Sequence, residues 1–116
     1  MEDRRASQRL TLRLPAIYRI IGAKLPALAT VVNIGPTGVC FITASRIDGN
    51  PEIELTIELE TDNSVCLNTR LVWSEDTNNS GEFQNGVKII NGDSEDKEEF
   101  IDFCNRKLSN PPESLS

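Results

Sequence analysis

The segment EIELTIELE, residues 52–60, alternates strictly between polar and apolar side chains. Isoleucine or leucine occupies every second position, and glutamate or threonine occupies the positions between them. Successive side chains of a strand point to opposite faces, so this order buries one face of a sheet and exposes the other. One buried and one solvated face is typical of an antiparallel sheet, and the segment therefore favours an all-β fold.

Five further segments have strand patterns, and the connections between them are short. In TLRLPAIYRI, the apolar residues at even positions from Leu12 to Ile20 share one face, and Arg13 and Arg19 share the other. Pro15 within this run indicates an edge position or a bulge. The other four segments are LATVVN (28–33), GVCFIT (38–43), SVCLNTRLVW (64–73) and FQNGVKII (83–90). Six such strands predict an antiparallel barrel or sandwich.

The pattern changes to a helical one after residue 91. Asp93 or Ser94 can cap a helix, and Glu95 and Asp96 then stand in its positive first turn. An apolar stripe at helical spacing follows, made of Phe100, Ile101, Phe103, Cys104 and Leu108. We expect one terminal amphipathic helix whose stripe covers an open part of the sheet as core, rather than a surface for a partner.

Charge is distributed unevenly along the chain. The net charge is −6, which disfavours binding of DNA or RNA through a broad basic face. Residues 1–24 contain six basic and two acidic residues, a balance of +4, whereas the other 92 contain six basic and sixteen acidic residues, a balance of −10. A basic segment on an acidic body suits a compact anion better than a polymer.

Side chains that commonly carry catalysis or bind metals are scarce. The sequence has no histidine, which removes the commonest general base and the Ser-His-Asp and Cys-His nucleophile systems. Cys40, Cys66 and Cys104 are widely spaced, form no CxxC pair and have apolar neighbours, so we expect buried, reduced thiols. The glutamates of residues 52–60 are interpreted as a solvated face rather than a metal site. We expect no catalytic residue and no metal.

The sequence has no membrane or export signal that we can identify. No apolar run approaches the roughly 18 residues that a transmembrane helix needs. The charged start MEDRRASQRL also lacks the apolar core of a signal peptide. We therefore expect a cytoplasmic protein without membrane insertion.

The segment NIGPTG, residues 33–38, separates two of the expected strands. Pro36 and Gly38 stand at the second and fourth positions of a four-residue turn, which is typical of type I. The side chain of Asn33 can hydrogen-bond the backbone two residues further on. Taken alone, this segment is explained by a hairpin that needs no ligand.

The basic segment RRASQR, residues 4–9, directly precedes the first strand. Such an N-terminal segment is usually mobile and solvated. Arg5 and Arg9 are four residues apart, with Arg4 beside them, so their guanidinium groups can converge on one ligand if the segment wraps around it. Each guanidinium can bind phosphate oxygens or the O6/N7 edge of guanine with two hydrogen bonds, and can stack on a base.

Together, the two segments resemble the signature of the PilZ domain, which has RxxxR before the first strand and [D/N]xSxxG between the second and third. The matching residues are Arg5, Arg9, Asn33, Gly35 and Gly38. A late strand ending in Val-Trp, a later Gly-Val strand and the terminal helix are also similar, so the resemblance covers about residues 4–108. It implies a six-stranded antiparallel β-barrel with a C-terminal α-helix.

Many PilZ domains are bacterial receptors for cyclic di-GMP, and the resemblance implies this ligand and no cofactor. Arg5 and Arg9 would hold its phosphates and guanine edges, Asn33 would offer an amide to a guanine edge, and Gly38 would admit close backbone approach. Arg4 matches a variable flanking position and could contact a second nucleotide. We expect the ligand to fold the arm across the barrel mouth and so alter the surface offered to an unidentified protein partner.

Gly35 departs from the signature, because the family has serine there. Loss of one hydroxyl hydrogen bond typically costs about 0.5–1.5 kcal/mol, so we expect a weakened site rather than none. Gly35 also supports an alternative, a PilZ-like protein-interaction module in motility or secretion that binds no nucleotide. The intact pair Arg5 and Arg9 argues against it.

We expect three parts along the chain. Residues 1–11 are a flexible basic arm, residues 12–108 are the barrel with its helix, and residues 109–116 are a disordered tail.

Overall fold

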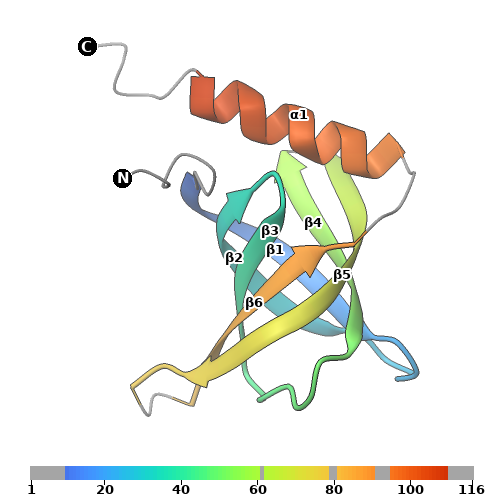
Figure 1. Ribbon diagram of the computed structural model, residues 1–116, viewed down its shortest axis with the longest axis vertical. Coiled ribbons are helices and arrows are strands. Elements are labelled where there is room, and N and C mark those ends of the chain that lie inside the picture. The colour runs from blue at the N-terminus through green and yellow to red at the C-terminus, as the bar shows by residue number, and fades with distance from the viewer. Residues whose placement is uncertain (1–9, 61, 79–80, 91–94, 110–116) are drawn as a thin grey trace.

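The computed structural model describes residues 10–60, 62–78, 81–90 and 95–109, with side chains up to residue 107. Its six strands form a closed antiparallel barrel in the order β1-β2-β3-β6-β5-β4, and one helix lies across one end (Figure 1). The elements are β1 (Leu10–Ile20), β2 (Ala27–Gly35), β3 (Gly38–Thr43), β4 (Glu52–Glu60), β5 (Asn63–Asp76), β6 (Phe83–Ile89) and α1 (Glu95–Ser109). The expected barrel with a C-terminal helix is confirmed.

Alternating apolar side chains fill the barrel. The isoleucines and leucines of β4 are each at most 4% exposed, whereas its glutamates are exposed or half-buried. In β1, Ala16 and Tyr18 point inward and are buried, while Pro15 and Ile17 are exposed. Both strands thus follow the period of two expected from their sequences.

The first strand starts earlier than expected and is irregular. β1 begins at Leu10, so Leu10 and Thr11 belong to the sheet and not to the arm. The register against β2 shifts between Thr11 and Leu14, directly before Pro15. The bulge expected in this run therefore lies just before Pro15, which itself stays in register with Thr30.

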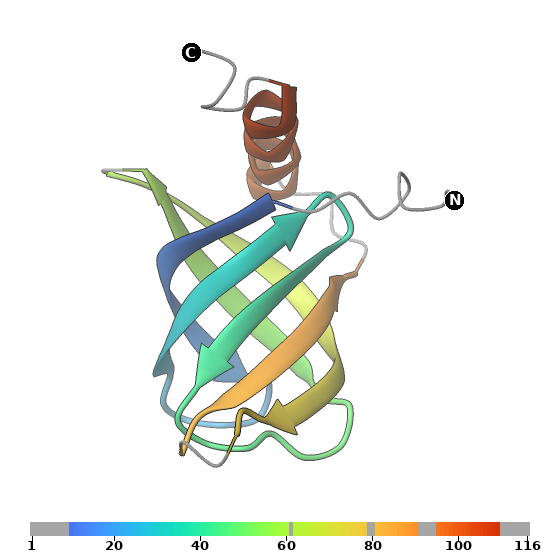
Figure 2. The same ribbon diagram turned by 90° about the vertical axis from the view of Figure 1, so that its left-hand side faces the viewer.

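Helix α1 covers the end of the barrel at which β1 begins (Figures 1 and 2). Phe100, Phe103 and Cys104 are at most 1% exposed and belong to the core, and Ile101 packs against it half-buried. The apolar stripe is therefore core, as expected. The expected cap at residues 93–94 and the side chain of Leu108 lie outside the described residues.

The first turn of α1 also contacts an edge of the sheet. β5 pairs with β6 only from Thr69 onward, so within the described chain residues 63–68 have no strand partner on that side. The Cys66 N–H donates to Asp96 Oδ2 at 2.9 Å, and the Ile90 N–H donates to the Asn68 carbonyl at 3.0 Å. The helix and the segment after β6 thus cover this edge.

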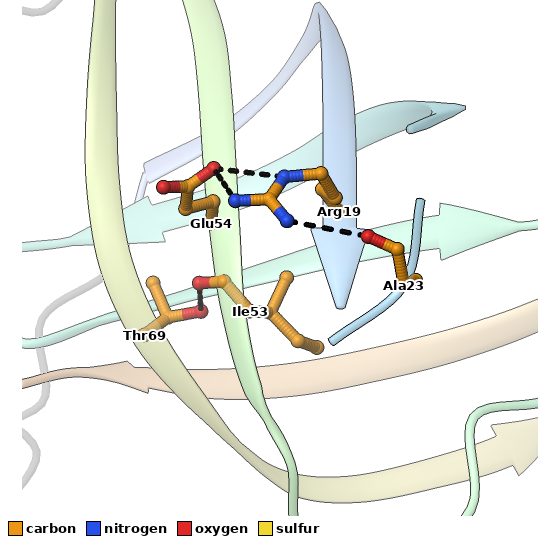
Figure 3. A network of polar contacts seen from close by, with 5 residues as sticks. All are labelled: Arg19, Ala23, Ile53, Glu54 and Thr69. Atoms are coloured by element: carbon orange, nitrogen blue, oxygen red, sulfur yellow. Dashed lines mark hydrogen bonds and ion pairs between the residues drawn. The ribbon is translucent and has the colours of Figure 1, made fainter. Parts of the chain in front are cut away.

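Two outward-facing glutamates of β4 pair with arginines on neighbouring strands. Glu54 Oε1 accepts hydrogen bonds from Arg19 Nε at 3.1 Å and from Arg19 Nη2 at 2.8 Å (Figure 3). Arg70 Nη2 lies 2.8 Å from Glu52 Oε2. These partly exposed pairs fit a solvated face, and each contributes about 0.2–1 kcal/mol.

The three thiols have different surroundings. Cys40 and Cys104 are buried, but Cys66 is exposed, so the expectation of a buried thiol is wrong for Cys66. Its neighbours Val65 and Leu67 point into the barrel, and alternation in β5 turns Cys66 outward.

Candidate functional site

The segment NIGPTG forms the end of β2 and a two-residue turn into β3. Gly35 and Gly38 are Cα partners across the turn, with Pro36 and Thr37 between them. None of these four is among the described residues with positive φ, as a type I turn requires. The Thr37 carbonyl accepts a hydrogen bond from the Ile89 N–H at 3.0 Å, which holds the turn against β6.

A bulge in β2 positions Asn33. The register against β3 shifts between Val31 and Asn33, and Asn33 is the Cα partner of Cys40. Val31 and Ile34 are fully buried, so the two residues between them face outward, and Asn33 is half-buried there. The extra residue thus turns the amide of Asn33 to the outer surface of the barrel.

Strand pairing places residues of β3, β6 and β5 side by side with Asn33 around the outer surface of the barrel. Cys40 is the partner of Gly86 in β6, and Gly86 is the partner of Trp73 in β5. Neighbouring strands lie about 4.7–4.9 Å apart, so roughly 14 Å of sheet separates Asn33 from Trp73 around the barrel, where β2 and β5 stand opposite each other. A small thiol and a glycine lie between them: Gln84 Nε2 donates to the Cys40 sulfur at 3.3 Å, and the indole covers Gly86.

The next outward-facing positions along these strands are two glycines and a lysine. Gly35 pairs with Gly38, and Gly38 pairs with Lys88, whose side chain is exposed. A hollow of about 180 Å³ lies on the outer surface where β3, β6 and β5 run side by side. It is lined by Thr37, Gly38, Val39, Cys40, Val72, Trp73, Gly86, Val87 and Lys88. A floor of small residues beside an aromatic ring and an ammonium group suits a planar, anionic ligand.

The indole of Trp73 lies directly on Gly86. A Cβ added at Gly86 would be 2.7 Å from Trp73 Cζ2 and closer still to Nε1 and Cε2. The ring is 40% exposed, so one part rests on the glycine and another is open to solvent. Glycine at position 86 is therefore required for the indole to lie against the sheet.

The chain enters the barrel beside this surface. Leu10 is the partner of Ile34, and Thr11 is the partner of Asn33. The residue preceding Leu10 in the sequence is Arg9. The expected clamp residues Arg4, Arg5 and Arg9 themselves lie outside the described residues.

The structure thus brings together only part of the expected site. Asn33, Gly35 and Gly38 lie on neighbouring levels of one surface, as their motif implied. Sequence reasoning did not assign Trp73, Gly86 or Lys88 to the site. The resemblance to the family included the Val-Trp and Gly-Val strands. Only the register of the sheet shows that Trp73 pairs with Gly86 and that Gly86 pairs with Cys40 of β3.

Resolved pKa shifts lie in the barrel interior and not at this surface. Burial raises the pKa of the Cys104 thiol to about 11. Burial also raises the pKa of Tyr18, although a hydrogen bond with Thr43 opposes this. Within the described residues, no group of three or more histidine, cysteine, aspartate or glutamate side chains is placed to hold a metal ion.

Comparison with known proteins identifies the family. The family model described as the PilZ domain matches residues 3–106, and the chain therefore belongs to the PilZ family. This family is known for receptor and adaptor domains that respond to cyclic di-GMP. Comparison with curated protein sequences gives no match.

Two solved structures have the same fold. One is the Bacillus subtilis inhibitor of motility (MotI/DgrA), with a TM-score of 0.73 and 13% identity over 90% of this chain. This chain corresponds to 51% of the length of that protein. The other is the PilZ domain of CeSA from a cellulose-synthesising bacterium, with a TM-score of 0.65 and 9% identity. That match covers 87% of this chain and 98% of the CeSA domain.

One further finding concerns membranes. Within the described part of the chain, no helix is both long and apolar enough to cross a bilayer.

Proposed function

We propose that this protein is a receptor for cyclic di-GMP that signals to a protein partner. The observation that carries the proposal is the hollow bordered by Gly38, Lys88 and the Trp73 indole, with Asn33 and Gly35 on the adjoining strand β2. It combines the family's second motif with a floor of small residues and an exposed indole. A guanine base can stack on the indole, with about 1–3 kcal/mol per stacked base.

The arm would complete the site. Arg9 directly precedes Leu10, whose partner Ile34 adjoins Gly35 in β2. Guanidinium groups on this segment would bind the two phosphates and a guanine edge, and Arg4 would contact a second nucleotide. Lys88 adds a positive charge next to Gly38. Binding would then order the arm over the barrel and change the surface offered to the partner.

Gly35 supports a second candidate, an adaptor that binds its partner without nucleotide. Glycine removes the hydroxyl that the family motif has at this position. It leaves the backbone N–H, and it adds no side chain between the turn and a ligand. Its expected effect is a loss of about 0.5–1.5 kcal/mol, which weakens a micromolar site without removing it.

Calorimetric titration separates the two candidates. We expect cyclic di-GMP to bind in the micromolar range and well ahead of GTP or cyclic AMP. Trp73→Phe, which keeps a ring on Gly86, should retain more affinity than Trp73→Ala. Absence of heat with cyclic di-GMP at a concentration of about 1 mM would leave the adaptor as the function.

A further inference from the structure

Large aliphatic side chains are exposed on the side of the barrel formed by β1 and β2. Leu28 is 80% exposed and Ile17 is 43% exposed, and the two are Cα partners in neighbouring strands. The loop that joins these strands adds Ile21 and Leu25, which are 50% and 81% exposed. Contiguous exposed apolar surface of this kind marks interaction sites.

The adjoining strands separate and leave a groove. The pairing of β1 with β4 ends at Ala16 and Ile57, although β1 extends back to Leu10 and β4 extends to Glu60. The next residue of β1, Pro15, has no N–H to continue the ladder. Figure 2 shows the end of β4 diverging from β1. Among the described residues, Glu58–Glu60 have no strand partner on this side.

The groove has an apolar side and an acidic side. Its volume is about 550 Å³, and its lining includes Pro15, Ile17 and Leu28 on one side and Glu58, Asp62 and Ser64 on the other. Glu58 and Asp62 are exposed and form no ion pair within the described chain, unlike Glu52 and Glu54 of the same strand. The unneutralised carboxylates favour a cationic occupant.

We propose that this groove binds an extended, cationic segment of a partner protein, added as a strand to the free edge of β4. The segment's backbone pairs with the edge at Glu58–Glu60, its apolar side chains contact Ile17 and Leu28, and its lysines or arginines face Glu58 and Asp62. Strand addition gives affinity through main-chain hydrogen bonds and specificity through alternate side chains.

The groove lies opposite the β6 part of the cyclic di-GMP surface, although β2 and β5 contribute residues to both. In the closed order of six strands, β1 stands opposite β6. The groove centres on β1, whereas Gly86 and Lys88 of the other surface belong to β6. The two sets of lining residues do not overlap, and the inference about the groove does not depend on nucleotide binding.

Fluorescence anisotropy with a short labelled peptide of alternating lysine and leucine tests the proposal on the full chain. Glu58→Lys and Leu28→Asp should each weaken binding about tenfold, whereas Glu98→Lys and Val72→Asp should change it less than about twofold. These controls match each charge change at exposed positions elsewhere. Leu28→Asp adds negative charge, so general electrostatic attraction to the peptide would strengthen binding and not weaken it.

A second peptide tests the strand pairing. The same sequence with N-methyl groups on alternate amides keeps its charge but loses backbone donors, and it should bind about tenfold more weakly. Equal affinity of the two peptides would overturn strand addition. Equal weakening by Glu58→Lys and Glu98→Lys would overturn the groove as the site, as would absence of binding.

Two other occupants would give different results. If the groove joins two copies of the chain, sedimentation will show a dimer that Leu28→Asp dissociates. If the chain's own arm fills it, alanine at Arg4, Arg5 and Arg9 together will raise the peptide affinity. Either result would overturn a partner segment as the occupant, whereas a monomer with unchanged affinity supports it.

Discussion

Replacing Gly86 with alanine should force the Trp73 indole away from the sheet. A Cβ at this position would overlap the ring, and because Trp73 is already 40% exposed, we expect the ring to move outward. If about 100 Å² of indole surface returns to solvent, the loss is about 2.5 kcal/mol. Alanine offsets about 0.5–1 kcal/mol of this, since glycine is unfavourable within a strand.

The expected net loss in the free energy of unfolding is therefore about 1.5–2 kcal/mol, or a fall in Tm of roughly 5–15 °C for a domain of this size. Denaturant unfolding measures the free energy, and the emission of Trp73, the only tryptophan, should shift to longer wavelength as the ring becomes solvated. Affinity for cyclic di-GMP should fall as well, because the displaced ring no longer borders the floor.

A double-mutant cycle decides whether the ring is the cause. In the Trp73→Ala background, Gly86→Ala should be neutral or stabilising, since no indole remains to be displaced. The coupling energy between the two positions should then equal the ring's contribution, about 2.5 kcal/mol. Equal destabilisation by Gly86→Ala in both backgrounds would refute the overlap as the reason for glycine at this position.

Four further predictions concern the arm, the turn and the thiols. Arg5→Ala or Arg9→Ala should each cost about 1.5–3 kcal/mol of cyclic di-GMP binding by calorimetry, with little change in Tm; unfolding of either apo variant would contradict a ligand-binding role. Gly35→Ser should tighten binding up to roughly tenfold, because the turn needs no positive φ at residue 35; equal or weaker affinity with an intact fold would count against a serine-like role there. Burial raises the pKa of the Cys104 thiol from 9.0 to about 11, so the thiol loses its proton at lower pH in the unfolded chain than in the folded protein. The free energy of unfolding should therefore fall between pH 9 and 11. Denaturant titrations should show that Cys104→Ala removes this fall. In the native protein a thiol reagent should modify Cys66 quickly and Cys104 slowly, and equal rates would contradict the burial difference.

Local patterns made most of the fold predictable from the sequence. Alternating or continuous apolar runs between turn signals identified the six strands, alternation identified the buried face of β4, and the helical stripe identified α1, because each pattern depends on neighbouring residues alone. The same local reasoning failed for Cys66. Apolar neighbours on both sides suggested burial, but the inward direction of Leu67 places Cys66 outside.

The candidate site was less predictable because it depends on register. Asn33 lies level with Cys40 only because of the bulge in β2, and Gly86 lies beneath Trp73 only because β5 shifts between Leu71 and Trp73. A shift of one residue in either ladder would send these side chains to the other face. Sequence motifs identified the turn, whereas the pairing of distant strands determined what surrounds it.

The hydrogen bond between Asp96 and the Cys66 backbone has a consequence for the solution behaviour of shortened chains. Residues 63–68 carry a row of main-chain donors and acceptors, of which Asp96 in α1 and Ile90 after β6 bind two. Removing the helix would expose this edge and the apolar core beneath the helix. Exposed strand edges pair with strands of other molecules. Chains truncated before Glu95 should therefore polymerise, and loss of activity in them would report insolubility before it reported anything about signalling.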